Sequence, residues 1–203
     1  MPKKALLVID VDHANSWDAD HFSWRGTTRD VAAAITKRLD LWRRNNEGLV
    51  AFVMFPGTTE QARSIYAGHE MMTKLVPDWA HRCGDTGCIA CDSPEKMRLA
   101  PFLAHRHDPF EPVFIKYSHD AFKNKRLAPY LRQSGVQEIY LAGCLTDECV
   151  EVTAFGALCA NFSITLLGDC VDYPVTTDMQ KEDWVQSMGF YSRPRPHLSV
   201  RVE

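Results

Sequence analysis

The chain has 203 residues, of which 45% are hydrophobic and 24% are charged, so it can form one large domain with a sizeable core. Its net charge of −3 provides no basic surface for nucleic acid or anionic lipid, and no apolar run approaches the ~20 residues of a membrane span. The apolar run at residues 5–9 is too short for a signal peptide, so we expect a cytoplasmic protein whose seven cysteines stay reduced.

Short apolar runs alternate with helix-like patterns along the chain. The sequence predicts strands at about residues 3–10, 49–55, 112–117, 136–143 and 163–169, and a possible edge strand at 197–202. It predicts helices at about residues 27–48, 58–72, 93–106 and 124–135, from about 146 onwards, and at 176–190. In the first helix, Val31, Ile35, Leu39 and Trp42 share one face, and Gly48 ends the pattern.

Apolar strands that alternate with helices favour a parallel sheet with helices on both faces. We therefore expect a three-layer α/β/α, Rossmann-like fold with a mostly parallel sheet of five to six strands. No internal repeat or linker divides the chain, so we expect one domain over residues 1–203, with a loop-rich, cysteine-containing insertion at about 74–94. In such folds the ligand lies beyond the carboxyl ends of the strands.

Three reactive side chains lie just past predicted strand ends, namely Asp10, Lys116 and Cys149. Alone, Asp10 is typical of a turn, Lys116 of a side chain that reaches solvent, and Cys149 of a buried structural thiol. Together they form a complete nucleophilic set, because a thiol that attacks a carbonyl needs a base, and a nearby ammonium favours the thiolate.

The position of Cys149 bears on its pKa. If a helix begins near Thr146, Cys149 lies in its first turn, where backbone N–H groups and the helix dipole favour a thiolate. Lys116 acts in the same direction and Asp10 in the opposite one, so the net shift of the thiol pKa stays open. Cys144, at the strand end, is interpreted as a small packing residue.

Three segments, ALLVIDVD, VFIKYSHDAF and IYLAGCLTDECVEVTAFGAL, resemble the signature blocks of the isochorismatase-like cysteine hydrolases. They occur in the expected order and spacing, and the resemblance covers essentially the whole chain. The third block is the most specific, with Gly, two variable residues, Thr-Asp, one variable residue, Cys-Val and then Thr-Ala. This superfamily includes nicotinamidases, N-carbamoylsarcosine amidohydrolases, and ureidoacrylate and biuret hydrolases.

The resemblance implies that Asp10 is the general base, Lys116 its electrostatic partner and Cys149 the nucleophile. It also implies a cis peptide between Cys144 and Leu145, which would direct the backbone N–H groups of Leu145 and Cys149 at a developing oxyanion. Members with the cysteine mostly open amides, ureides and imide-derived acids. We therefore expect hydrolysis of a C–N bond in a small non-peptide amide, ureide or carbamoyl compound through a Cys149 acyl-enzyme, with no cofactor required for catalysis.

Two other functions remain open at this point. True isochorismatases cleave a vinyl ether without needing the thiol, and a non-catalytic, zinc-linked scaffold protein could retain the same fold. For all of these we expect no nucleic-acid or membrane partner. The resemblance further implies a small-molecule substrate for an enzyme of this kind, and a homodimer or homotetramer.

The chain departs from nicotinamidases after the second predicted strand. Those enzymes carry an Asp-x-His motif there that holds a metal beside the substrate ring, whereas this chain has FPGTTEQARSIYAGHE, in which His69 stands alone. A nicotinamidase activity is therefore doubtful. A pair between His119 and Cys149 is conceivable, but a polar loop histidine is the preferred interpretation of His119.

Two further groups of residues are candidates for binding. Cys83, Cys88 and Cys91 have C-x4-C-x2-C spacing, which can hold a structural zinc ion with His81, His69 or Asp92 as fourth ligand, or they are simply packed thiols. The aromatic residues that could line a flat substrate pocket, or could instead only pack there, are Trp17, Phe22, Trp24 and Tyr117.

Overall fold

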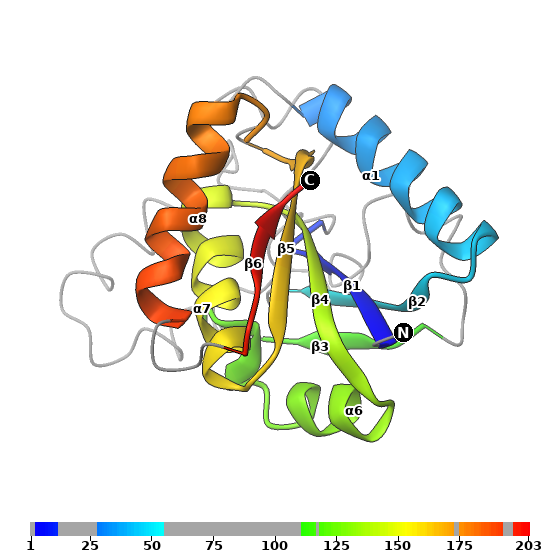
Figure 1. Cartoon of the computed structure of the whole chain (residues 1–203). Coiled ribbons are helices and arrows are strands. Elements are labelled where there is room, and N and C mark those ends of the chain that lie inside the picture. Colours follow the sequence, from blue (N-terminus) through cyan, green and yellow to red (C-terminus); the bar gives the residue numbers. More distant parts are fainter. Residues whose placement is uncertain (1–2, 12–27, 55–110, 117, 173–174, 193–196) are drawn as a thin grey trace, which may run out of the picture.

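One parallel sheet organises the part of the chain that the computed structural model describes, residues 3–11, 28–54, 111–116, 118–172, 175–192 and 197–203. Six strands lie in the order β3-β2-β1-β4-β5-β6, and every neighbouring pair is parallel (Figure 1). The strands are β1 (Lys3–Ile9), β2 (Gly48–Met54), β3 (Val113–Ile115), β4 (Val136–Gly143), β5 (Ser163–Val171) and β6 (Val200–Val202). The predicted sheet type and strand number are confirmed.

Helices cover both faces of this sheet. They are α1 (Thr28–Arg44), η2 (Ala121–Lys123), α6 (Leu127–Gln133), η3 (Thr146–Val150), α7 (Glu151–Cys159) and α8 (Asp178–Ser192). Figure 1 shows α1 on one side of the strands and α7 and α8 on the other. The three-layer arrangement follows, and no helix among the described residues is both long and apolar enough to cross a membrane.

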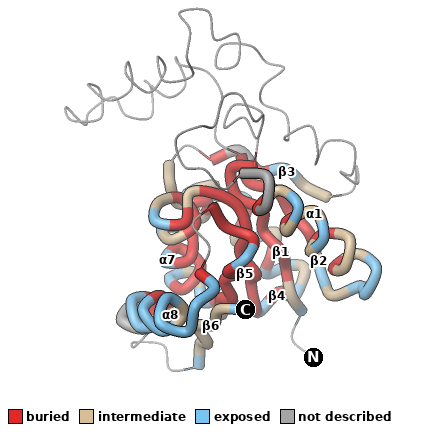
Figure 2. Tube along the Cα trace, turned by 90° about the horizontal axis from the view of Figure 1, so that it is seen from above, coloured by how far each residue is buried: buried red, intermediate tan, exposed pale blue. Residues whose placement is uncertain are grey.

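The two hydrophobic layers are built from alternate residues of the strands. In β1, Leu6 and Val8 face the layer under α1, whereas Leu7 and Ile9 face the layer under α6, α7 and α8. The helix α1 contributes the four residues that were predicted to share a face, Val31, Ile35, Leu39 and Trp42, and all are buried. Figure 2 shows the buried residues concentrated in the strands, while α8 exposes much of its length.

Most predicted boundaries in the described part agree with the structure, and the differences have local causes. Gly135 ends α6 as predicted, with a φ of 75° in the left-handed region that glycine favours. The first helix ends at Arg44, and Gly48 is the first residue of β2. A glycine is needed there because a Cβ would overlap the carbonyl of Lys4 in the adjacent strand. The helices predicted at 58–72 and 93–106, and the insertion at 74–94, lie outside the described residues.

Candidate active site

Three strand ends bring Asp10, Lys116 and Cys149 together at one edge of the sheet. Asp10 follows β1, and its N–H donates to the carbonyl of Val53 at 2.8 Å. Lys116 follows β3, and its N–H donates to the carbonyl of Met54 at 2.9 Å. Because β2 lies between β1 and β3, its last residues hold Asp10 and Lys116 at the same level along the strands. Cys149 enters from η3, directly after β4.

The ammonium of Lys116 is the shared contact of the cluster. Its Nζ lies 2.7 Å from Asp10 Oδ2 and donates to Cys149 Sγ at 3.0 Å. A longer contact of 3.5 Å reaches the carbonyl of His119. Lys116 has no exposed surface, and Asp10 and Cys149 are also buried. The interpretation of Lys116 as a side chain that reaches solvent is therefore wrong.

Burial and the neighbouring charges set the resting protonation of this cluster. Burial alone would lower the pKa of Lys116, but Asp10 and Cys149 outweigh it and raise that pKa, which keeps the ammonium charged. The pKa of Cys149 is raised, first by burial and then by the negative charge of Asp10, more than Lys116 lowers it. A raised pKa favours the neutral thiol, so the structure gives a direction to the net shift that the sequence left open.

The backbone around Cys144 matches the expected turn. The peptide between Cys144 and Leu145 is cis, and the Cys144 N–H donates to the carbonyl of Ile9 at 3.0 Å. The buried Cys144 thiol donates to the carbonyl of Asp10 at 3.2 Å. Cys144 is thus a packing residue that joins the ends of β4 and β1, as the sequence predicted.

Asp172 contacts the turn that carries Cys149, and sequence reasoning missed it. It follows β5 and is buried, and its Oδ1 accepts from both the N–H and the hydroxyl of Thr146, each at 2.7 Å. Thr146 is the first residue of η3, the π-helical turn that carries Cys149. The sequence contained a signal for this residue, because Asp172 directly follows an apolar strand, as Asp10 does. Asp172 therefore holds the start of the turn that carries Cys149.

His119 lies beside Cys149. Its Nδ1 is 3.3 Å from Cys149 Sγ, so this loop histidine makes the contact with Cys149 that the sequence analysis left as the less preferred alternative. Burial, and then the charge of Lys116, lower the pKa of His119, so the imidazole is neutral near pH 7. Its position three residues after the end-of-strand lysine is the signal that could have favoured a contact with the site.

Comparison with known proteins identifies the family of this chain. A family model described as the isochorismatase domain matches residues 4–192. The chain belongs to the isochorismatase family. No curated protein matches the sequence at a significant level. As an isochorismatase-family protein, the chain is a hydrolase of that superfamily.

Solved structures of this family share the fold. N-carbamoylsarcosine amidase from Thermoplasma acidophilum is 19% identical with a TM-score of 0.65, covering 98% of this chain and 96% of that one. Nicotinamidase from Bacillus subtilis is 19% identical with a TM-score of 0.63, covering 98% and 99%. An isochorismatase-like hydrolase from Alkaliphilus metalliredigens is 17% identical with a TM-score of 0.63, covering 98% and 93%. At these identities the likeness concerns the fold.

Several predicted binding residues of this isochorismatase-family chain lie outside the described residues. These are the aromatic residues Trp17, Phe22, Trp24 and Tyr117, and the cysteine group Cys83, Cys88 and Cys91. Within the described ranges, no cluster of three or more His, Cys, Asp or Glu side chains could hold a metal ion. The substrate pocket and the zinc site therefore stay predictions.

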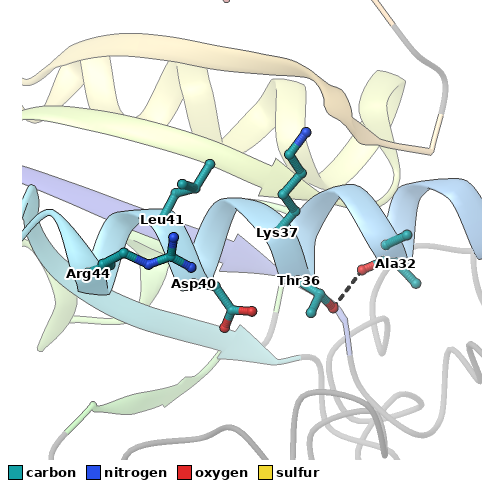
Figure 3. Close-up of a pocket in the computed structure, with 7 residues that line it drawn as sticks. Ala32, Thr36, Lys37, Asp40, Leu41 and Arg44 are labelled. Atoms are coloured by element: carbon teal, nitrogen blue, oxygen red, sulfur yellow. Dashed lines mark hydrogen bonds between the residues drawn. The ribbon is translucent and has the colours of Figure 1, made fainter.

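A hollow of about 580 Å³ along the outer side of α1 is separate from this cluster (Figure 3). Its lining includes Ala32, Thr36, Lys37 and Asp40. None of its residues belongs to the triad of Asp10, Lys116 and Cys149. The Thr36 hydroxyl donates back to the carbonyl of Ala32 at 2.8 Å, as the dashed line in Figure 3 marks. The described residues that line this hollow all belong to α1, and they do not form a catalytic group.

Proposed function

We propose that this protein is a cysteine hydrolase that cleaves the C–N bond of a small non-peptide amide, ureide or carbamoyl compound. The observation that carries the proposal is a thiol, Cys149, within 3.0 Å of an ammonium, Lys116, that is itself paired with a buried carboxylate, Asp10, at 2.7 Å. A nucleophile, a base and a fixed cation in contact are the groups that acyl transfer needs.

In the proposed reaction, Asp10 accepts the proton of the Cys149 thiol as the sulfur attacks the substrate carbonyl. The fixed charge of Lys116 stabilises the thiolate as it forms. The N–H groups of Leu145 and Cys149 are proposed to stabilise the oxyanion. The protonated Asp10 then gives its proton to the leaving nitrogen, which leaves an acyl-enzyme at Cys149. Water then attacks the acyl-enzyme and gives a proton to Asp10. The C–S bond breaks, the acid product is released, and Asp10 returns the proton to the sulfur of Cys149.

The thiol favours C–N hydrolysis over vinyl-ether cleavage, because vinyl-ether cleavage has no step in which a nucleophilic sulfur is needed. The amidase and nicotinamidase named among similar structures support the same class. Within this class, nicotinamide itself is disfavoured, since the sequence lacks the Asp-x-His pair after β2.

A screen of small amides, ureides and carbamoyl compounds, measured as ammonia release, tests the proposal. Activity on at least one compound should disappear in Cys149→Ala. Activity that persists in Cys149→Ala would overturn the acyl-enzyme mechanism, and cleavage of a vinyl ether alone would overturn the substrate class.

Other parts of the proposal complete this picture of a small-molecule enzyme. We propose that Trp17, Phe22, Trp24 and Tyr117 contribute to the substrate pocket, that no cofactor takes part in catalysis, and that the protein is a cytoplasmic homodimer or homotetramer. The four described cysteines are free thiols, which is consistent with a reducing compartment.

A further inference from the structure

His119 is held in place by contacts that do not involve the nucleophile. Its carbonyl accepts from the hydroxyl of Thr153 at 3.2 Å, and Thr153 lies one helical turn after Cys149. The same hydroxyl accepts from the N–H of Ala121 at 3.1 Å, on the other side of His119. The backbone of His119 is therefore tied to the helix that follows the nucleophile.

The neighbour of His119 strengthens this attachment. Asp120 caps η2 by accepting from the N–H of Phe122 at 2.8 Å, and its carboxyl fills the space where a Cβ of Gly156 would lie. Gly156 belongs to α7, as Thr153 does. Because two contacts fix the loop against α7, the approach of His119 Nδ1 to Cys149 Sγ is a consequence of the fold.

The direction of the contact between His119 and Cys149 follows from the number of protons. The thiol has one proton, and Lys116 can only donate to the sulfur. Asp10 contacts the same ammonium as the sulfur, and in the proposed reaction its carboxylate accepts the thiol proton. If the S–H is directed at Asp10, as that reaction requires, an imidazole nitrogen 3.3 Å from the sulfur can take part only as a donor.

We propose that His119 is a further catalytic residue, which donates its Nδ1–H to the Cys149 sulfur and stabilises the thiolate as Asp10 removes the thiol proton. The inference rests on the proposed cysteine-hydrolase function. The proton moves from sulfur to Asp10 and no proton leaves His119, so the imidazole is neutral before and after the step. A second N–H donor offsets part of the penalty that burial imposes on the anion.

The surroundings of the imidazole support a single N–H. Burial and the charge of Lys116 lower its pKa, whereas Glu148 and Asp10 act in the opposite direction with less effect. A neutral imidazole has one protonated nitrogen, and donation to the sulfur places that proton on Nδ1.

Alkylation of Cys149 tests this role without any substrate. The rate with iodoacetamide is measured across a pH series, and peptide mass spectrometry reports each cysteine separately. In His119→Leu the Cys149 rate should fall about tenfold or more at a given pH, as expected when an anion loses a hydrogen bond. In His119→Asn the amide can place a donor near the Nδ1 position, so the rate should stay within about threefold of wild type.

The other thiols serve as internal controls. Cys159 is exposed, so its rate should not change, and labelling of buried Cys144 or Cys170 would reveal unfolding. A His119→Leu protein that is folded and alkylated at the wild-type rate would overturn the proposal. A His119→Asn rate as low as that of His119→Leu would also overturn it, because the imidazole would then act as a proton acceptor.

The tautomer of His119 in the wild type gives a test that depends on no variant. Nitrogen-15 NMR should show the proton on Nδ1 at neutral pH, and a proton on Nε2 alone would overturn the donor role. If both tests succeed and the screen finds no amide or ureide substrate, the proposed function fails while the contact of His119 with the thiolate stands.

Discussion

Lys116 is the residue whose removal should cost the most stability within the triad. Its ammonium is fully buried and lies 2.7 Å from the buried carboxylate of Asp10. Lys116→Ala removes the cation and leaves the anion inside, which typically costs about 3–5 kcal/mol of unfolding free energy. Urea unfolding measures this loss.

The matched control removes both charges at similar volume. Asp10→Asn with Lys116→Met should recover most of the stability that Lys116→Ala loses, because no unpaired charge remains. A Lys116→Ala protein as stable as the wild type would show that the pair is exposed to water in solution.

The triad should behave as one unit in catalysis. Cys149→Ala, Asp10→Asn and Lys116→Ala should each reduce kcat by about 10⁴ or more, and a double substitution should be no worse than the most damaging single one. Ammonia release measures activity, and circular dichroism confirms that Cys149→Ala is folded. Losses that multiply in the double variant would mean that these groups act in separate steps.

Protonation of His119 should destabilise the folded protein in mild acid. Burial and then Lys116 hold its pKa below the ordinary value of 6.5, so the unfolded chain binds this proton first as the pH falls. The unfolding free energy should therefore decrease as the pH drops below about 6.5, and this part of the decrease should be missing in His119→Asn.

Urea unfolding of both proteins between about pH 8 and pH 5 checks this. Asp120, whose pKa burial raises, is present in both and cancels in the comparison. Parallel curves for the two proteins would contradict the prediction.

At the scale of elements, η3 depends on the clamp between Thr146 and Asp172. Asp172→Ala leaves the N–H and hydroxyl of Thr146 without this acceptor, which should cost about 1–3 kcal/mol of stability. It should also lower kcat, because Cys149 lies in the same turn. Asp172→Asn keeps an acceptor oxygen and should retain more of both. Equal losses in the two variants would assign the effect to the charge rather than to the clamp.

The sequence predicts elements well where the cause is local. The bounds of β4 were predicted residue by residue, because an apolar run lies between Gly135 and the turn at Cys144. The π-helical form of η3 was not predicted, since its first residue is held by Asp172 from a strand later in the chain. The contact of His119 was set aside for a similar reason, because it depends on Thr153 and Gly156 in α7.

At the scale of the whole molecule, the sequence predicted the sheet type and the meeting of three strand ends. It did not predict that the cysteine stays protonated, because the thiol pKa depends on burial by layers that only the folded chain provides. The expectation that the first turn of a helix lowers the thiol pKa leaves out the effect of burial, and Cys149 is buried.

Chelation should leave catalysis intact. The sequence lacks the metal-binding pair of nicotinamidases after β2, and any zinc at Cys83, Cys88 and Cys91 is predicted to be structural. Elemental analysis should give either no metal or about one zinc per chain. A chelator that stops turnover at once, while circular dichroism is unchanged, would contradict this prediction.

The buried lysine also fixes the total charge of the reacting cluster. At rest, one carboxylate, one ammonium and one neutral thiol add up to zero. After the proposed proton transfer, a neutral carboxyl, the same ammonium and a thiolate would again add up to zero. The negative charge moves from one neighbour of Lys116 Nζ to the other, 2.7 Å and 3.0 Å away, around a cation that does not change. The net charge of these three groups is therefore the same before and after the proposed step, so the step needs no counterion from solvent.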